Sequence, residues 1–518
     1  MPGAGAQFKR ALIFVHRWMG VFFCLLFLSW FASGFVMMYW QYPQVSAADR
    51  LSRAPLLDAS QIHVSPAQAY ARLETNTSPI EARLVTYDGR PAYRFRIGLG
   101  EISTVYADDG RIPEDFPADL TLRIAAAWTG QLPGAAQEED NTEADQWTVS
   151  EEFADLRPLR KYSWADGEQV YVSTVTGEVV QYTTRGSRLA AYFGAIPHWL
   201  YFTPLRKHGQ RWGRVIIWAS GLGTLAAILG ITLGLWMYSP SRTYRRAGEP
   251  AGFPYHGSKH WHAILGLFFG LFACSWAFSG MLSMDPFPKL QEGADDTLGA
   301  RLAAALRSEP PLEVFSAKPP QSIVAEAQAD FGSPVKQLEL TSCAGQPAYL
   351  AVLQTNETRV IPVLGRPAAE FDRDRIIDAL DRAARPFAFA AVRRVTEYES
   401  YYLDRDNKLP LPAIFVQFND PVRSTYYIDP KTARIVQSYN SSSRWNRWLY
   451  HGLHSLNLPW LYKHRPAWDI AVILLLLGGA SLSVTALILA WNVLWRKVAP
   501  WASPHETAAV EKGASGRL

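Results

Sequence analysis

Histidine is the residue type that this sequence places most consistently for chemistry. Nine of the eleven histidines lie at or next to the ends of long apolar segments, where a neutral imidazole can bind a metal ion. A lone histidine in such a place is usually an interfacial anchor. Six of them, however, recur as pairs at an offset of 246 residues (the first pair) or 256 residues (the other two): His16 with His262, His198 with His454, and His208 with His464.

The first pair shares a pattern of small and aromatic residues along one helical face. Steps of four and three residues from each histidine define two matching stripes: Gly20, Phe23, Phe27, Trp30 and Gly34 after His16, and Gly266, Phe269, Ala273, Trp276 and Gly280 after His262. A glycine one turn from a histidine leaves room for a flat macrocycle, and the rings beyond it can pack against the macrocycle edge. The alternative interpretation is tight packing between spanning helices, which also favours small residues.

Two neutral histidines from different helices suit the two axial positions of a haem iron. Zinc usually recruits three or four ligands, often cysteine or carboxylate, and no carboxylate lies near these positions. Cys24 and Cys274 lie within apolar segments and are expected to be small core residues. We therefore expect His16 and His262 to hold one haem between them.

Four apolar runs provide the helices that must position these histidines. They are residues 11–40, 215–238, 263–284 and 470–491, and none contains Asp, Glu or Lys. Each is long enough to cross a bilayer, which takes about 20 residues of helix. The first is too long, and lacks the cleavage site, for a signal peptide, so we expect it to be retained.

The composition excludes several other classes of protein. Of the 518 residues, 48% are hydrophobic and 19% charged, which excludes a disordered chain. Because 51 Lys and Arg nearly balance 47 Asp and Glu, no nucleic-acid partner is expected. Three cysteines are too few for a disulfide scaffold. No nucleotide-binding or hydrolase motif is present, and the run GLGTLAAILG at residues 221–230 indicates helix packing.

The chain also repeats itself outside the histidines. Ser29-Trp30 recurs as Ser275-Trp276, and the segment 89–93 (GRPAY) recurs as 345–349 (GQPAY), so the offset changes from 246 to 256 through an insertion between residues 280 and 345. Each half then comprises a span, a large outer segment and a second span. A pseudo-twofold axis along the membrane normal is the natural arrangement of two such halves.

The two outer segments are expected to be mixed α and β, each built from two helix-plus-sheet units. Alternating residues predict strands at 93–97, 104–108, 169–173 and 424–429, and helices are expected at 66–73 and 373–384. The fold class is thus a membrane α-helical bundle of four helices, duplicated two plus two, with two α+β outer segments. The predicted divisions are 1–40 (amino end and first span), 41–200 (first outer segment), 201–238 (second span), 239–262 (inner loop), 263–284 (third span), 285–455 (second outer segment), 456–495 (fourth span) and 496–518 (inner tail).

Charged residues in the short loops predict the orientation. Lys and Arg gather at the amino end and between the second and third spans, at Lys9, Arg10, Arg17, Arg242, Arg245, Arg246 and Lys259. Short loops rich in these residues stay in the cytoplasm. We expect both termini to be cytoplasmic, although basic residues such as Arg211 and Arg447 on the outer side weaken the contrast.

These features together resemble a known family. The segment YYIDPKTARIV at 426–436, the GRPAY and GQPAY strands and the helix before each strand group resemble PepSY domains. Their placement between spans bearing HRWMG…SWFASG and HWHAILG…SWAFSG resembles the PepSY-associated transmembrane family, which includes iron-regulated inner-membrane proteins and ferric-siderophore reductases that carry haem b. The resemblance implies a bacterial inner-membrane protein with haem b, two haems by expectation, and periplasmic PepSY segments.

The resemblance also guides the choice of the outer haem ligands. The settings IPHWL around His198 and GLHSL around His454 resemble the outer histidine element of the family. His208 with His464 is the alternative pair, and His451 has no partner, because residue 195 is alanine. Arginines near the expected sites either neutralise haem propionates or are ordinary interfacial cations: Arg17, Arg188, Arg214 and Arg444.

By resemblance, the function is to carry electrons across the membrane to a periplasmic acceptor, ferric iron in a siderophore or another acceptor, from a quinol or a cytoplasmic reductase. Residues of the reaction beyond the haem ligands stay unassigned. Lipid is the other expected partner, and the sequence leaves open whether the chain dimerises. Two alternatives remain: a PepSY binding or regulatory module anchored by the spans, and a metal-ion transporter, which intramembrane carboxylates would favour but these spans lack.

Overall fold

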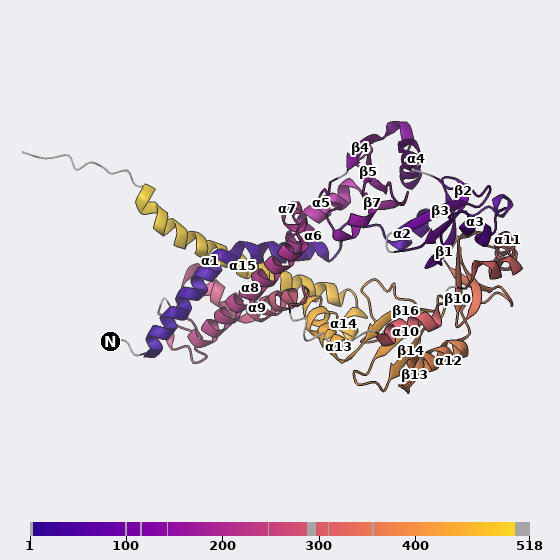
Figure 1. The fold of residues 1–518 in the computed structure, drawn as a ribbon. Coiled ribbons are helices and arrows are strands. Elements are labelled where there is room, and N and C mark those ends of the chain that lie inside the picture. Colours follow the sequence, from indigo (N-terminus) through magenta and orange to yellow (C-terminus); the bar gives the residue numbers. More distant parts are fainter. Residues whose placement is uncertain are drawn as a thin grey trace, which may run out of the picture. The chain divides into compact units, whose positions relative to one another are not determined.

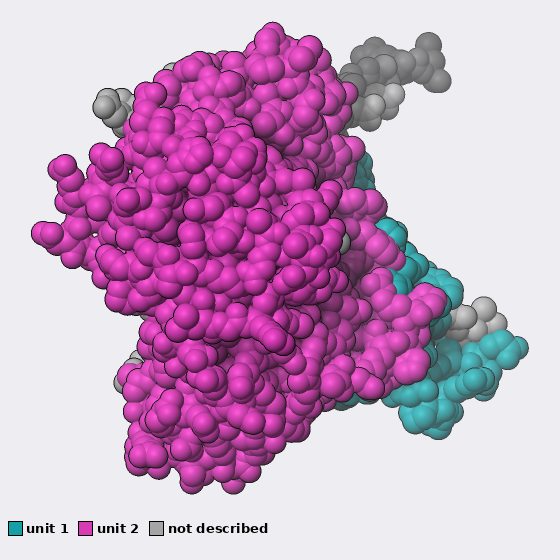
Figure 2. Space-filling model, turned by 90° about the vertical axis from the view of Figure 1, so that its right-hand side faces the viewer, with its two compact units in different colours: residues 1–35, 217–281, 469–518 teal, residues 36–216, 282–468 magenta. Residues whose placement is uncertain are grey.

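The protein is described from a computed structural model that covers residues 4–98, 101–113, 116–141, 143–246, 248–286, 297–308, 310–354 and 357–502. The chain divides into two compact units. Unit 1 comprises residues 1–35, 217–281 and 469–518, and unit 2 comprises residues 36–216 and 282–468; Figures 1 and 2 show the ribbon and the two units. Residues 503–518, which are part of the predicted inner tail, lie outside the described residues. So do residues 287–296, which are part of the interval that holds the expected insertion.

Unit 1 is formed by long apolar helices that confirm the four predicted spans. They are α1 (Ala4–Met37), α8 (Gly209–Met237), α9 (Gly257–Leu282) and α15 (Ala467–Ala502). Each includes a stretch long and apolar enough to cross a membrane. A short hairpin, β8 (Tyr244–Arg246) with β9 (Glu249–Ala251), connects α8 to α9. The chain is therefore a multi-pass membrane protein.

The outward faces of these helices are apolar, as contact with lipid requires. Large side chains such as Phe22 and Phe268 are 77% and 72% exposed, and only 22–28% of the most apolar part of each span is buried. Water would penalise such surfaces at about 25 cal/mol per Å², whereas lipid does not.

Glycines allow the helices of unit 1 to pack closely. A Cβ atom at Gly223 would lie 3.3 Å from the ring of Phe27, and one at Gly478 would lie 2.2 Å from the ring of Phe269. Both rings belong to the predicted histidine stripes. At these two positions the aromatic residues of the stripes thus fill helix–helix contacts, as the packing interpretation expects.

Unit 2 contains a six-stranded antiparallel sheet to which both outer segments contribute. Its strand order is β12-β11-β10-β1-β2-β3. Each segment supplies three consecutive strands, and β1 pairs with β10 at the centre, where Arg83 lies opposite Glu339. The strands are β1 (Glu81–Tyr87), β2 (Arg90–Arg96), β3 (Ile102–Tyr106), β10 (Val335–Cys343), β11 (Gln346–Leu353) and β12 (Thr358–Pro362).

Helices cover one face of this sheet and build its core. α3 (Pro66–Ala71) and α11 (Pro320–Phe331) pack Ala69, Ile323 and Ala327 against the fully buried rings of Tyr93 and Tyr349. Capping by Ser65 and proline at the first turn explain why α3 begins where it does. The predicted helix at 66–73 is confirmed in position but ends two residues earlier.

Two four-stranded sheets complete unit 2, one from each outer segment. The first has the order β4-β5-β6-β7 and packs against α4 (Ala118–Thr129). The second has the order β13-β14-β15-β16 and packs against α12 (Arg373–Ala384). The bounds of α12 are those predicted from the sequence. The strands are β4 (Gln137–Asn141), β5 (Leu159–Ser163), β6 (Gln169–Ser173), β7 (Val179–Thr183), β13 (Phe389–Val395), β14 (Ala413–Phe418), β15 (Thr425–Asp429) and β16 (Arg434–Tyr439).

Short helices connect these sheets with one another and with the spans. They are α2 (Ala47–Arg53), α5 (Arg185–Phe193), α6 (Ala195–Trp199), α7 (Thr203–Arg206), α10 (Thr297–Leu306), α13 (Ser441–Asn446) and α14 (Pro459–Tyr462), the π-helix η6 (Arg447–Gly452), and the 3-10 helices η1 (Ala59–Gln61), η2 (Pro133–Ala135), η3 (Glu151–Leu156) and η5 (Leu312–Ala317). α5 and α13 begin with the same capping arrangement, from Thr184 and Asn440, which lie 256 residues apart.

Strands are found at all four positions predicted from alternation: β3, β6 and β15 lie within two residues of the prediction at each end, and β2 begins three residues earlier than predicted. Local turn chemistry explains the hairpins: Asp88-Gly89 and Ala344-Gly345 both have positive φ, which two-residue hairpin turns of type I′ require. One expectation was incomplete. The sequence predicts two helix-plus-sheet units for each segment, but the first sheets of the two segments are joined into one through β1 and β10.

Candidate functional site

The structure brings together the first predicted pair, which we call the inner histidines. His16 comes from α1 and His262 from α9, and both are half-buried. Their ring centres are 6.4 Å apart, and the ring planes are inclined by 41°. The two imidazoles therefore face a common space within unit 1 instead of pointing separately into lipid.

Hydrogen bonds assign the protonated nitrogen of both inner histidines. His16 Nδ1 lies 3.1 Å from the carbonyl oxygen of Ala226 in α8, which only accepts. His262 Nδ1 lies 3.0 Å from Oγ1 of Thr485 in α15, and that hydroxyl already donates to the carbonyl of Leu482 at 2.7 Å. In both neutral rings Nδ1 is thus the donor, and Nε2 keeps its lone pair for a metal ion.

A glycine of α8 makes room for the imidazole of His16. A Cβ atom at Gly230 would lie 2.7 Å from Cε1 and 3.3 Å from Nε2 of His16. Only glycine therefore allows the ring to reach the Ala226 carbonyl, one turn earlier on the same helix. The predicted macrocycle glycines are open in comparison: nothing lies within 4 Å of a Cβ at Gly20, and only Leu482, at 3.9 Å, approaches one at Gly266.

The structure also brings together the second predicted pair, which we call the outer histidines; this pair lies in unit 2. His198 lies in α6 and His454 follows η6, and both are half-buried. Their ring centres are 6.0 Å apart with an interplanar angle of 73°. The ring of Tyr450 lies 5.6 Å from that of His454 and 4.7 Å from that of His451.

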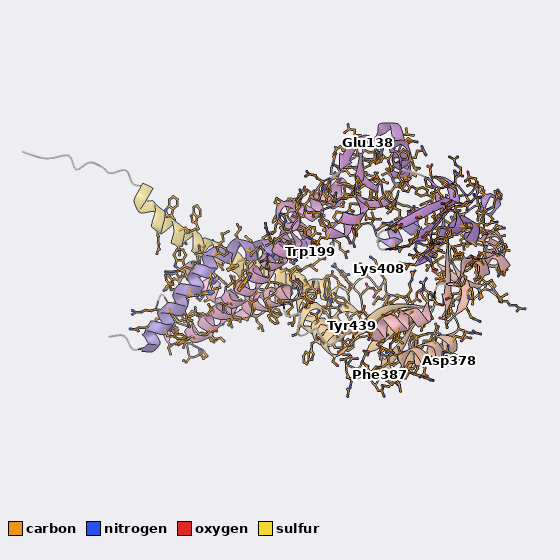
Figure 3. All side chains as sticks on the ribbon, in the orientation of Figure 1. Glu138, Trp199, Asp378, Phe387, Lys408 and Tyr439 are labelled. Atoms are coloured by element: carbon orange, nitrogen blue, oxygen red, sulfur yellow. The ribbon has the colours of Figure 1, made fainter. Side chains whose placement is uncertain are left out.

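Each outer histidine is held in the same local frame. Two residues after each one, a leucine adopts a left-handed backbone conformation, Leu200 with φ 50° and Leu456 with φ 47°. The residue directly after each histidine accepts a hydrogen bond from an indole N–H: Trp212 donates to Trp199 at 2.9 Å, and Trp468 donates to Ser455 at 3.0 Å. Trp199 is labelled in Figure 3.

A buried arginine, Arg447, lies in η6 shortly before His454, and sequence analysis did not select it as a site residue. Arg447 is 4% exposed. Its Nε donates to the carbonyl oxygen of Ser400, and its Nη2 donates to the carbonyl oxygen of Asn457 at 2.9 Å. Its other terminal nitrogen, Nη1, is buried and has no hydrogen-bond partner among the described residues. Burial lowers the pKa of this guanidinium. A carboxylate in reach of Nη1 would complete its hydrogen bonding.

The alternative outer histidines do not form a pair. His208 and His464 are exposed, and no ring contact joins them in the described part of the chain. His464 Nδ1 lies 2.6 Å from the carbonyl oxygen of Trp460. His451 is exposed, and its ring lies beside that of Tyr450 at an angle of 50°.

Two of the arginines expected near the sites have structural partners. Arg188 donates to the Gly167 carbonyl and the Thr183 hydroxyl, both at 2.9 Å. Arg444 likewise donates to the Arg423 carbonyl and to a threonine hydroxyl. Each thus fastens its helix to a neighbouring turn.

The other two arginines lie on the surface. Arg214 is exposed, and its Nε donates to Gln210 at 3.3 Å. Arg17 is exposed above the ring of Phe14. Within the described residues, neither arginine makes a hydrogen bond or ion pair with an inner or outer histidine.

The described residues contain no cluster of three or more His, Cys, Asp or Glu side chains that would hold a metal ion by itself. A structural zinc site of three or four protein ligands is therefore not formed by these residues. Each histidine pair could supply two imidazole nitrogens to a metal whose other ligands come from elsewhere.

The fold defines the class of protein: a multi-pass membrane protein whose spans flank mixed α and β segments. Comparison of sequences then gives the family. Residues 13–388 match the PepSY-associated TM region, and because this match covers more than half of the 518 residues, the chain belongs to that family. A comparison with curated proteins finds no match.

Proposed function

We propose that the protein is a haem b-containing reductase of the bacterial inner membrane, which passes electrons to a periplasmic acceptor, ferric iron held by a siderophore. The observation that carries the proposal is the pairing of histidines at two separate places, each pair with one imidazole from each half of the chain. A binding module that used the spans only as anchors would not require either pairing.

The separation of the rings supports ligation of one iron by each pair. A metal ion bonds an imidazole nitrogen at about 2 Å, and the ring centre lies about 1.2 Å farther away. Two imidazoles that held one iron between them would therefore have ring centres about 6.4 Å apart. The observed separations are 6.4 Å for the inner and 6.0 Å for the outer histidines.

The hydrogen bonds of the inner histidines support the same assignment. Metal-bound histidines commonly donate their second ring N–H to a carbonyl or another acceptor, which fixes the tautomer and the ring orientation. Ala226 and Thr485 provide these acceptors for His16 and His262. Gly230 keeps the His16 ring in place, and the open position at Gly20 leaves space one turn away.

The outer site has a donor that suits the carboxylates of haem. Arg447 Nη1 is buried without an acceptor in the described chain, and the same guanidinium fixes Asn457, three residues after His454. Leaving such a donor unpaired is costly, by about 1–3 kcal/mol. We assign Arg447 to a propionate of the outer haem.

When bound, haem b supplies one-electron transfer between a donor and an acceptor. The protein's own contribution is to hold the two imidazoles of each pair beside each other, and to orient both inner rings through hydrogen bonds at Nδ1 so that Nε2 can bind the metal. A quinol or a cytoplasmic reductase is the proposed electron donor.

We further propose that the chain is an internal duplication with its termini in the cytoplasm. Arg83 and Glu339, opposite each other in β1 and β10, lie 256 residues apart, which supports a pseudo-twofold axis through that pair. Basic residues near the amino end and in the β8–β9 loop support a cytoplasmic location for the amino end and for this loop. Unit 2 is then periplasmic.

A transport function is less well supported. In the described spans the only carboxylate is that of Asp469, in the first turn of α15, which begins three residues before the predicted run. A path for metal cations usually requires carboxylates deeper in the bilayer.

The proposal is tested with the purified full-length protein in lipid vesicles. After anaerobic reduction with dithionite and removal of the excess, the absorption spectrum should show the bands of reduced haem. These should be replaced by the bands of oxidised haem when ferric ferrioxamine B is added outside and takes up the electrons. The gallium complex of the same siderophore, which cannot be reduced, is the matched control and should leave the bands unchanged. If neither complex changes the haem bands, the proposed acceptor is wrong. A colourless protein would support the alternative of a membrane-anchored binding module. Bound metal without a Soret band would favour transport.

A further inference from the structure

A small pocket lies in unit 2 beside the centre of the six-stranded sheet, and none of the paired histidines lines it. Its volume is about 230 Å³. It is lined by the residues that lead into β1, by the segment after α10, and by β10 and β16. Both outer segments therefore contribute to its walls, at the place where their sheets join.

Positive charge is in excess around the pocket. Arg307 and Arg434 line it, and both donate to the same carboxylate oxygen of Glu339. Glu81 also lines it, but two further arginines, Arg83 at 3.1 Å and Arg96 at 3.3 Å, neutralise that carboxylate. Four guanidinium groups thus face two carboxylates, which favours an additional anion.

One donor at the pocket has no acceptor. Nη1 of Arg307 is buried and makes no hydrogen bond within the described chain, while Nη2 of the same group binds Glu339. Leaving a buried N–H without an acceptor costs about 1–3 kcal/mol, which an oxygen of a bound carboxylate would offset.

Apart from Ser308 and Thr341, the remaining lining residues are apolar, and the pocket is small. Leu312, Phe315 and Leu340 line it, and Phe315 is fully buried. A volume of about 230 Å³ equals that of about eight water molecules in the liquid. It is below the range of about 300–1,000 Å³ that drug-sized ligands occupy. A ferric siderophore is larger still, so this pocket is not the acceptor site proposed above.

We propose that this pocket binds the carboxylate of a small organic acid, with Arg307 Nη1 as the donor and the apolar wall against the body of the acid. The inference does not depend on haem. A ligand there would contact both outer segments at once, because both contribute lining residues.

The test is isothermal titration of the full-length protein, in a buffer free of organic acids, with phenylacetate. Phenylacetamide, which has the same shape without the charge, is the matched ligand control. We expect phenylacetate to bind at least about tenfold more tightly than the amide, as a charge-assisted hydrogen bond predicts. Equal binding of the two compounds, or no binding at millimolar concentrations, would overturn the proposal.

The variant Arg307→Gln tests the donor and should weaken phenylacetate binding at least about tenfold. Arg359→Gln is the control, because Arg359 pairs with Glu357 elsewhere on the same sheet and does not line the pocket. If Arg307→Gln fails to fold, as its loss of Nη2–Glu339 allows, Arg434→Gln tests the same charge at a more exposed position. Unchanged affinity in a folded variant at either lining arginine would refute the assignment.

Discussion

Alanine at position 230 should damage the inner site without touching either histidine. Its Cβ atom would lie 2.7 Å from Cε1 of His16, about 0.8 Å inside the shortest favourable carbon–carbon distance of about 3.5 Å. The helix backbone holds the Cβ in place, so the imidazole must move away and lose its hydrogen bond to Ala226.

The expected magnitude follows from these two effects. Overpacking costs about 1–3 kcal/mol, and loss of one hydrogen bond costs about 1 kcal/mol. Together they give about 2–4 kcal/mol, which corresponds to about a 30- to 1,000-fold weaker affinity for haem at the inner site. The assay is titration of haem into haem-depleted protein, followed by its absorption spectrum.

The matched control is Gly213→Ala in the same helix, because a Cβ atom there has nothing within 4 Å. It should bind haem as the wild type does. A second control combines Gly230→Ala with His16→Ala, and the combined variant should be no worse than His16→Ala alone, since both act on one ligand. Unchanged haem affinity in Gly230→Ala would refute the position inferred for the His16 ring.

Three further predictions test other contacts. Thr485→Val removes the acceptor of His262 and should weaken haem binding about tenfold, whereas Thr485→Ser should restore it; equal affinity of the two variants in the same haem titration would contradict the tautomer assigned to His262. Trp468→Phe removes the indole hydrogen bond to Ser455 and should perturb the electron paramagnetic resonance signal of the outer haem while leaving that of the inner haem unchanged; a change in neither signal would argue against the frame described for His454. Arg90 holds the pKa of the Asp108 carboxyl below its usual value, so Asp108→Asn should destabilise unit 2 by about 1 kcal/mol at pH 7. This difference in stability is fully present above about pH 4 and should disappear as the pH falls through the lowered pKa. If urea denaturation still shows the difference at about pH 2, it has another cause.

Much of the fold follows from patterns local in the sequence. Four apolar runs give the spans because length and composition alone decide whether a helix can cross a bilayer. Alternation over 169–173 gives β6, and Asp88-Gly89 gives a hairpin, because each depends on a few adjacent residues.

The partners of β1 are a different matter. Alternation identifies a strand but not its neighbour, since edge and central strands of an antiparallel sheet share the same pattern. The pairing of β1 with β10 joins residues about 256 positions apart and depends on how the two outer segments meet. For this reason the sequence predicts separate sheets where one continuous sheet is found.

The candidate sites show the same division. The offset between repeats is visible in the sequence, and it pairs His16 with His262 and His198 with His454. Gly230 and Thr485 were not found, because their roles depend on the rotation and height of α8 and α15 beside α1 and α9. Gly230 carries no signal beyond that of a packing glycine.

Arg447 was missed for a related reason. It has no counterpart, since residue 191 is alanine, and a comparison of repeats selects only what recurs. Its importance rests on burial and on an unpaired nitrogen, neither of which a sequence shows.

Haem stoichiometry tests the central claim most directly. The pyridine haemochrome assay on the purified full-length protein should give two haems b per chain, one in His262→Ala, one in His198→Ala and none when both changes are combined. His63→Ala, an exposed histidine outside both pairs, should keep two. A wild-type protein without haem, or a double variant that retains it, would contradict the account.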